Sequence, residues 1–262
     1  MKYRMALSLC AALVVAAVAT SARAEGWGNL KGKFVFDGTP PKPEPLLITA
    51  DKEYCSKHAP VDQSLVVGKD GGLANVVVYL YTKPGETVPI YEDYEDIKDE
   101  PVVLDNSKCA FEPHVATMWV KQPLVIKNSD EVAHNSKVDL FVNAAFNLQI
   151  PAGAKIEKTL EDAERLPSKV SCGAHPWMTS ILVVRPNPYV TKTDAAGNFE
   201  IKDLPAGEWE FQFWHEKWGY VKTVHIDGKK VDWTRGRTGL KIAAGKDTDL
   251  GTVKVNPEDY KK

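Results

Sequence analysis

The chain has 262 residues, of which 44% are hydrophobic and 26% are charged, and its formal net charge is −2. The first 24 residues hold three basic and no acidic residues, so the rest of the chain has 30 basic against 35 acidic residues, a net of −5. This acidic balance argues against nucleic-acid binding, which depends on cations that contact phosphates. No run beyond the N-terminus approaches the roughly 18 apolar residues of a transmembrane helix, and the length allows one large or two small domains.

Residues 1–24 have the features of a secretory signal peptide. Two basic residues precede an apolar run (6–18), and Ala22-Arg23-Ala24 provides a small-residue cleavage site before Glu25. The run is too short to span a membrane. We therefore expect cleavage near residue 25, a periplasmic or secreted location and no transmembrane anchor, with Cys10 an ordinary residue of the run and not a lipid-anchored cysteine.

The region before residue 100 predicts a few strands joined by irregular chain. Residues 29–37 alternate and end in an Asp-Gly turn, a pattern typical of a strand, and the proline-rich stretch 40–45 predicts an extended surface crossing. Residues 64–67 and 74–80 together predict a hairpin. The acidic stretch 84–100 predicts a solvated loop with one helical turn, and a docking surface for a basic redox partner is the alternative.

Strand signals become dense from residue 102. Short apolar runs alternate with turn-forming residues at spacings of about 8 to 12 residues, a pattern typical of a β-sandwich. The expected strands span residues 102–104, 116–120, 124–127, 136–141, 155–160, 169–172 and 180–184.

The turn between the last two of these strands holds residue types that bind soft metals. Cys172, His175 and Met178 have Cys-x2-His-x2-Met spacing, and His134 follows an apolar run and a turn upstream. Copper electron-transfer sites use two imidazoles and one thiolate in a trigonal set with a weak axial thioether. In a sandwich, one strand end and a neighbouring loop can meet at the same pole. The pattern therefore predicts a copper site made by these four side chains.

The motif Asn-x-Asp-x-x-x-His-Asn followed by Cys-x-x-His-x-x-Met resembles that of the blue copper proteins, the cupredoxins, with a Cys-to-Met spacing similar to that of amicyanin. The resemblance covers about residues 102–186 and implies an all-β, Greek-key cupredoxin-like β-sandwich with one type 1 copper ion. It also implies a role for each motif residue: equatorial ligands His134, Cys172 and His175, axial ligand Met178, and Asn135 as the residue that ties the two ligand loops together.

We expect a copper domain over residues 25–186, including an N-terminal extension, and a separate module over residues 187–262. Residues 190–209 resemble the transthyretin-like, carboxypeptidase regulatory-like modules in their Thr-Asp-x-x-Gly-x-Phe and Leu-Pro-x-Gly turns. This resemblance implies a small transthyretin-like (prealbumin-like) β-sandwich and says little about function. Its tryptophans fit the inward face of a strand, and stacking on sugars is the alternative.

Three cysteines remain after residue 24, an odd number for an oxidising compartment. With Cys172 as the metal thiolate, we expect a disulfide between Cys55 and Cys109; a disulfide to Cys172, or an inert buried thiol there, is the alternative. Zinc suits the site less well, because a thioether adds little to a zinc site. A catalytic cysteine is not favoured, because a metal-bound thiolate is not free to react. We expect His58 and His114 to be ordinary polar residues, with a second metal site as the alternative.

These features predict an exported type 1 copper protein that carries single electrons between redox proteins such as a c-type cytochrome or a dehydrogenase. We do not expect a catalyst, because one complete copper set is visible and oxygen reduction needs several electrons. Trp177 is either part of a docking patch or a packing residue. The alternatives are a copper carrier or storage protein without redox cycling, and an exported adhesion or carbohydrate-binding protein in which both sandwiches are structural.

Overall fold

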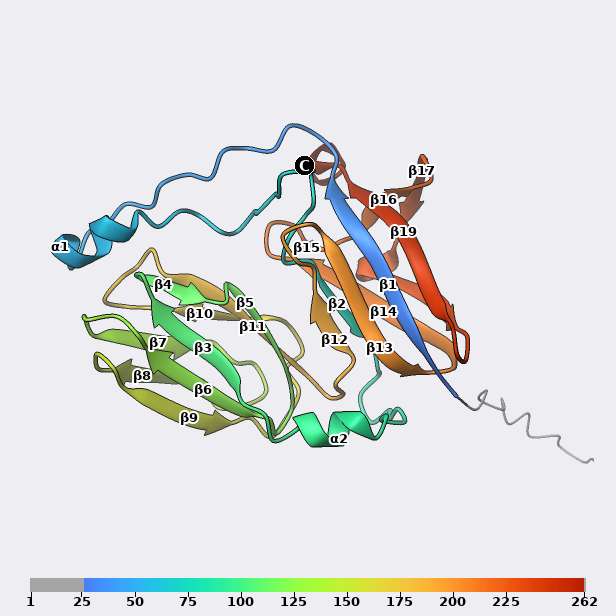
Figure 1. Cartoon of the computed structure of the whole chain (residues 1–262), viewed down its shortest axis with the longest axis horizontal. Coiled ribbons are helices and arrows are strands. Elements are labelled where there is room, and N and C mark those ends of the chain that lie inside the picture. The colour runs from blue at the N-terminus through green and yellow to red at the C-terminus, as the bar shows by residue number, and fades with distance from the viewer. Residues whose placement is uncertain (1–25, 262) are drawn as a thin grey trace, which may run out of the picture.

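The structure is a computed structural model that describes residues 26–261, and the expected signal peptide lies outside the described residues. Two β-sandwiches lie side by side (Figure 1), which confirms the prediction of an all-β fold. Among the described residues, no helix has the length and apolar character needed to cross a membrane. The helical segments are α1 (Lys52–Cys55), α2 (Asp93–Ile97) and the 3-10 turns Ser56–His58, Thr234–Gly236 and Pro257–Tyr260.

The central sandwich, residues 102–186, consists of two sheets with the strand orders β5-β11-β10-β7-β8 and β4-β3-β6-β9. Its strands bury alternate residues, as in β6, where Leu124 and Ile126 face the core. Each strand expected between residues 102 and 186 overlaps an observed one, and β4 and β8 were not expected. The strands are β3 (Val102–Ser107), β4 (Ala110–Glu112), β5 (Val115–Trp119), β6 (Pro123–Asn128), β7 (His134–Val138), β8 (Phe146–Ile150), β9 (Lys155–Thr159), β10 (Ser168–Ser171) and β11 (Thr179–Arg185).

The second sandwich, which we call the terminal sandwich, takes its strands from both ends of the described chain. Its sheets have the orders β13-β1-β19-β16-β17 and β12-β2-β14-β15, with β18 also paired to β14. The strands are β1 (Trp27–Phe36), β2 (Val77–Leu80), β12 (Val190–Lys192), β13 (Asn198–Pro205), β14 (Gly207–His215), β15 (Gly219–Tyr220), β16 (Thr223–Ile226), β17 (Lys229–Asp232), β18 (Arg237–Ile242) and β19 (Asp247–Val255).

This strand pairing groups the chain differently from the expected division into residues 25–186 and 187–262. β1 lies between β13 and β19, and β2 pairs with β12 and β14, so the central sandwich is inserted between strands of the terminal one. The hairpin expected from residues 64–67 and 74–80 is present only as a short piece before β2: Val67 pairs with Leu73 in an antiparallel bridge, and Ala74 N donates to Val66 O at 3.0 Å. Alternation reveals that a segment is a strand but not which distant strand it pairs with. The transthyretin-like resemblance stays a prediction.

The two sandwiches pack directly against each other through β2 and β11. Alternate residues of β2 face the terminal core, and the residues between them face the central sandwich. β11 is likewise buried on both faces, which explains why both strands are continuous apolar runs. The cluster between the sandwiches consists of Val77, Tyr79, Val115, Ile181 and Val183.

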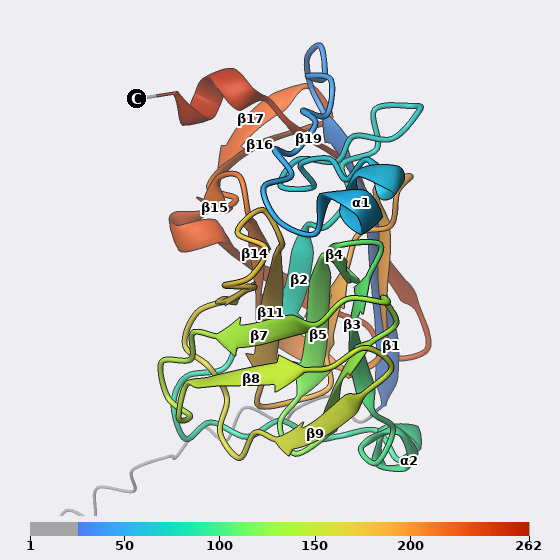
Figure 2. The same cartoon turned by 90° about the vertical axis from the view of Figure 1, so that its left-hand side faces the viewer.

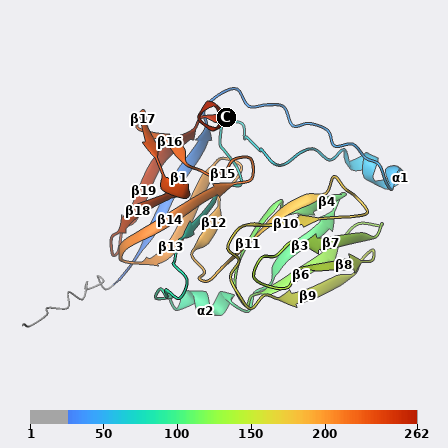
Figure 3. The same cartoon turned by 180° about the vertical axis from the view of Figure 1, so that it is seen from behind.

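An arm of the chain crosses from one sandwich to the other at the end of the molecule where α1 lies (Figures 1 and 2). The chain leaves the terminal sandwich after β1, reaches the central sandwich at α1 and returns to β2, whereas α2 lies at the opposite end (Figure 3). We define the arm as residues 44–62. Its two limbs are joined at the base by backbone hydrogen bonds from Leu46 N to Pro60 O (3.0 Å) and from Asp62 N to Glu44 O (2.9 Å).

Candidate metal centre

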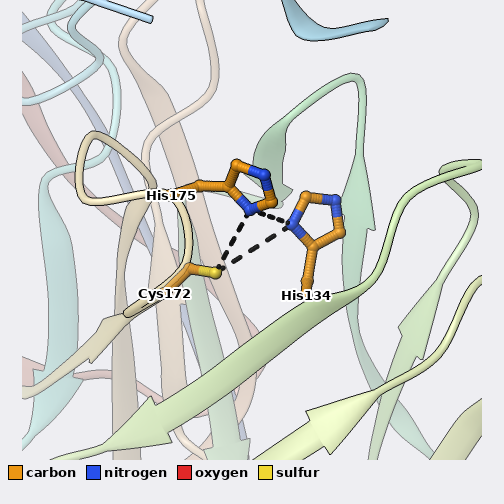
Figure 4. Close-up of side chains that lie close together, drawn as sticks. All are labelled: His134, Cys172 and His175. Atoms are coloured by element: carbon orange, nitrogen blue, oxygen red, sulfur yellow. Dashed lines mark hydrogen bonds between the residues drawn. The ribbon is translucent and has the colours of Figure 1, made fainter. Parts of the chain in front are cut away.

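Three of the side chains predicted as ligands converge at one pole of the central sandwich (Figure 4). His134 begins β7, and Cys172 and His175 lie in the loop between β10 and β11. The Nδ1 atoms of His134 and His175 are 2.9 Å apart, and Cys172 Sγ lies 3.5 Å from His175 Nδ1 and 4.0 Å from His134 Nδ1. All three residues are buried, with exposures of 1%, 2% and 0% for His134, Cys172 and His175.

Strand pairing explains why these residues meet. β7 runs antiparallel to β10, with Lys137 beside Ser171, so the start of β7 lies near the end of β10. The loop after β10 is closed by two backbone hydrogen bonds, from Cys172 N to Met178 O (3.2 Å) and from Met178 N to His175 O (2.9 Å). The fold therefore holds the loop ligands next to the first residue of β7.

The donor atoms have the spacing that one metal ion requires. In a triangle with sides of 2.9, 3.5 and 4.0 Å, the point equidistant from the corners lies about 2.1 Å from each, and bonds from zinc to imidazole nitrogen and thiolate sulfur are about 2.0 to 2.3 Å. A first-row ion at that point would contact all three donor atoms. Two imidazoles and a thiolate are also the trigonal set of copper electron-transfer sites. The donor set therefore fits a copper ion.

A second group of metal-binding residue types, Cys109, Asp130 and His134, also has its ligand atoms within 4.8 Å of one another. Cys109, however, forms a disulfide with Cys55, so its sulfur is not a thiolate. Cys172 is the free cysteine among residues 26–261. The thiolate that a soft metal prefers is therefore available in the first group and not in the second.

Each imidazole has its other ring nitrogen next to a carboxylate. His134 Nε2 lies 2.9 Å from Asp130 Oδ2, and His175 Nε2 lies 2.8 Å from Asp51 Oδ2. A metal-bound histidine usually donates this second N–H to a carboxylate or carbonyl, which fixes the tautomer and the ring orientation. The sequence analysis predicted neither carboxylate. Asp130 could have been found from the sequence, because it is the Asp of the motif that precedes His134. Asp51 lies far away in the arm, and no motif relates it to the ligands.

Asn135 connects the two segments that carry the ligands. Its backbone N–H donates to Cys172 Sγ at 3.4 Å, and its side-chain Oδ1 accepts from the backbone N–H groups of Gly173 (2.8 Å) and Ala174 (3.1 Å). These contacts join the start of β7 to the ligand loop, which is the connection that the cupredoxin resemblance implies.

Hydrogen bonds also set the protonation states of the ligands. Burial raises the pKa of the Cys172 thiol, but hydrogen bonds with His134, Asn135 N–H and His175 outweigh it and lower the pKa to about 6. Burial lowers the pKa of His134, but hydrogen bonds with Asp130 and Cys172 outweigh it and raise the pKa to about 9. At neutral pH the metal-free centre therefore holds a thiolate, the form that binds metals, and a metal ion must displace a proton from His134.

Met178 and Trp177 lie in the same loop. The Met178 side chain is 1% exposed and packs in the central core, and its role as axial ligand stays a prediction. The half-buried Trp177 ring lies 5.1 Å from the His175 ring, centroid to centroid, and its indole N–H donates to Cys109 O at 3.1 Å. A docking role for Trp177 also stays a prediction.

The two histidines considered for a second metal lie elsewhere. His114 Nε2 is 2.5 Å from Glu216 Oε2, a contact between the two sandwiches. His58 is exposed, and its ring lies 4.9 Å from the Tyr54 ring. Neither belongs to a group of three potential ligands within residues 26–261. The interpretation of both as ordinary polar residues stays a prediction.

No family model and no curated protein matches the sequence. Among solved structures, the chain is similar to the Cu-containing nitrite reductase (NirK) from Thermus scotoductus SA-01, with 17% identity and a TM-score of 0.30 over 40% of this chain and 25% of that one. It is also similar to a purple cupredoxin from Nitrosopumilus maritimus (21% identity, TM-score 0.28, 33% of this chain and 100% of that one). A reduced mutant of amicyanin gives 21% identity and a TM-score of 0.30 over 40% of this chain and 97% of that one.

The chain thus spans a quarter of the length of the nitrite reductase. These similarities are partial and concern the fold alone. The choice of ligands depends on the side-chain geometry described above and not on these matches.

Proposed function

We propose that the chain binds one copper ion at His134, Cys172 and His175, with Met178 as a weaker fourth ligand, and transfers single electrons as an exported type 1 copper protein. The observation that supports the proposal is the triangle of donor atoms, whose centre is at bonding distance for a single ion. Copper is favoured over zinc because the divalent order of affinities places copper higher and because a thioether is a poor zinc ligand.

Bound copper would supply a one-electron couple between its +1 and +2 states. The chain holds the donors in position before an ion binds: carboxylates fix both imidazoles, and the Asn135 N–H donates to the sulfur. Because these side chains are already held in place, their positions would change little between the two oxidation states, and electron transfer would require little rearrangement. With Nδ1 of His134 deprotonated to act as a ligand, Nε2–H would remain the donor to Asp130.

An electron carrier needs a donor and an acceptor. We propose that both are redox proteins of the exported compartment, of the kind represented by c-type cytochromes and dehydrogenases. The complete burial of His175 favours a second candidate function, a copper carrier or storage protein, because such a protein needs no accessible edge for electron exchange.

The test is metal analysis of the copper-loaded chain together with optical and electron spin resonance spectra of its oxidised form. We expect one copper ion per chain, an intense visible thiolate-to-copper band and reversible reduction. Cys172→Ser should lose the band, and His58→Gln, which changes an exposed histidine outside the centre, should keep it. A colourless protein that holds one Cu(II) ion would contradict the electron-carrier proposal. A site that holds only Cu(I) and does not cycle would favour the copper carrier or storage protein.

A further inference from the structure

The arm contributes to the surroundings of both imidazoles. Asp51 Oδ2 lies 2.8 Å from His175 Nε2. The Tyr54 hydroxyl donates to Asp130 Oδ1 at 3.0 Å, and Asp130 Oδ2 in turn lies 2.9 Å from His134 Nε2. Both outer ring nitrogens are therefore connected to the arm, one directly and the other through Asp130.

The tip of the arm is fixed to the central sandwich covalently and by packing. Cys55, the last residue of α1, forms a disulfide with Cys109, immediately before β4. Ile48 and Tyr54 pack against the central core, whereas Leu47 is 80% exposed. In extended chain, neighbouring side chains point in opposite directions. One face of the arm therefore lies on the central sandwich while the other faces solvent.

The arm closes the side of the metal centre on which His175 lies. The His175 side chain is fully buried, although its loop neighbours Ala174 and Pro176 are exposed. Its Nε2, on the side of the ring away from the other donor atoms, is next to the Asp51 carboxylate, which is 48% exposed. The hydrogen-bonding partner of Nε2 is therefore a half-exposed carboxylate that belongs to the arm.

The geometry points to the arm as a cover that is part of the metal centre: Asp51 positions the His175 ring, and the arm restricts electron exchange at the edge of that ring. The inference rests on the proposed copper function and extends it to a segment outside the central sandwich. Because Asp51 would act on the metal through His175, it is a positioning residue. The terminal sandwich would then serve as the base of this cover, because both limbs of the arm start from it (Figure 1).

Release of the arm from the central sandwich should have opposite effects on electron exchange if the arm is only structural and if it is a cover. If the arm only stabilises the fold, its release lowers stability and leaves electron exchange unchanged or slower. If the arm is a cover, its release makes electron exchange with small reagents faster. The rate of electron exchange therefore separates the two roles, whatever the change in stability.

The first experiment measures oxidation of the Cu(I) protein by two inorganic complexes of opposite charge, hexacyanoferrate(III) and tris(phenanthroline)cobalt(III). Loss of a negative charge alone accelerates the anionic reagent and slows the cationic one, whereas an opened edge accelerates both by more than the measured shift in reduction potential explains. We expect Asp51→Ala to raise both rate constants by about tenfold, equivalent to about 1.4 kcal/mol in the barrier. Glu53→Gln, which removes an exposed carboxylate from α1, should show the charge effect alone.

The second experiment releases the arm without changing its charge. Cys55→Ala combined with Cys109→Ala removes the disulfide and should also raise both rate constants. Copper content and thermal unfolding of this variant are measured in parallel. If it does not fold, Asp51→Ala, which keeps the disulfide, remains decisive. Rates that stay unchanged for both reagents in the folded variants would overturn the cover.

The role of Asp51 in positioning the His175 ring can be tested separately. Asp51→Ala should lower copper affinity by about 10- to 100-fold and shift the reduction potential, because the His175 ring loses the carboxylate next to Nε2. Asp51→Asn keeps an oxygen acceptor at that place and should restore most of the affinity. Equal behaviour of the two variants and the parent protein would contradict the positioning role.

A third measurement needs no metal and so separates failure of the cover from failure of the copper proposal. Diethyl pyrocarbonate modifies accessible imidazoles, and mass spectrometry locates the modified residue. In the metal-free protein we expect His175 to be protected in the parent chain and modified in the Cys55→Ala/Cys109→Ala variant. If no copper binds but this difference appears, the proposed function fails and the cover stands. Equal modification in both proteins would refute the cover.

Discussion

The two sandwiches have the same layered architecture but use their buried histidines differently. In the terminal sandwich, His215 is 1% exposed, with Nε2 3.2 Å from Ala74 O and Nδ1 accepting the Lys217 backbone N–H at 3.1 Å. The backbone therefore occupies both ring nitrogens. In the central sandwich, His134 and His175 turn one nitrogen each toward a common point beside a free thiol. Burial alone therefore does not make a histidine a metal ligand; the backbone must also leave a ring nitrogen available.

The largest expected effect is stabilisation of the central sandwich by copper. An ion that binds only the folded form stabilises it by about 4 kcal/mol at a thousandfold excess over Kd. Hydrogen exchange followed by mass spectrometry should show slower exchange in β7, in β10 and in residues 172–178 on copper loading. Exchange in β14 and β19 should stay nearly unchanged.

Cys172→Ser is the control for this prediction and should remove the copper-dependent protection. Equal protection of both sandwiches would show that they unfold as one unit, and the functional separation between them would then not extend to stability.

Acid should destabilise the terminal sandwich through His215. Burial lowers the pKa of His215 from 6.5 to about 4, so folding keeps the ring neutral where the unfolded chain would protonate it. The unfolded form binds more protons between these values, so stability is lost as pH falls from 6.5 to 4, by on the order of 3 kcal/mol. A proton on Nδ1 would face the Lys217 N–H that this atom now accepts.

Urea unfolding between pH 4 and 7, followed by hydrogen exchange in β14, measures this loss. His215→Gln should flatten the dependence because glutamine does not titrate. The same pH dependence in both proteins would assign the acid sensitivity to other groups.

Asn135→Ala should weaken the metal centre without disturbing the terminal sandwich. The substitution removes the acceptor of the Gly173 and Ala174 N–H groups, so the ligand loop loses its connection to β7. Loss of such an outer contact typically lowers metal affinity by about 10- to 100-fold. Competition with a chelator measures the change. Asn147→Ala, which removes only the surface partner of the Asn135 amide, is the matched control and should have a small effect.

Features that depend on neighbouring residues could be predicted from the sequence, whereas contacts between distant segments could not. The spacing of Cys172 and His175 is local, and His134 is placed by a strand end, so both ligand segments carry a signal. Asp51 carries none, because its position depends on the path of the arm. β8 was missed because it is half exposed and has only a short apolar pattern. β1 alternates clearly, but its partners β13 and β19 lie at the other end of the chain.

The smallest effect is expected where the two sandwiches meet. His114 and Glu216 have side-chain exposures of 6% and 23%, so their contact is shielded from water. Glu216→Gln keeps an acceptor but removes the charge, which should cost about 1 to 2 kcal/mol in thermal unfolding. Glu208→Gln, at an exposed position on β14, should cost less. The visible copper band should not change in either variant, because His114 is not one of the three donor residues. A shifted band in Glu216→Gln would mean that the contact between the sandwiches also adjusts the ligand geometry. The metal centre would then not be independent of the terminal sandwich.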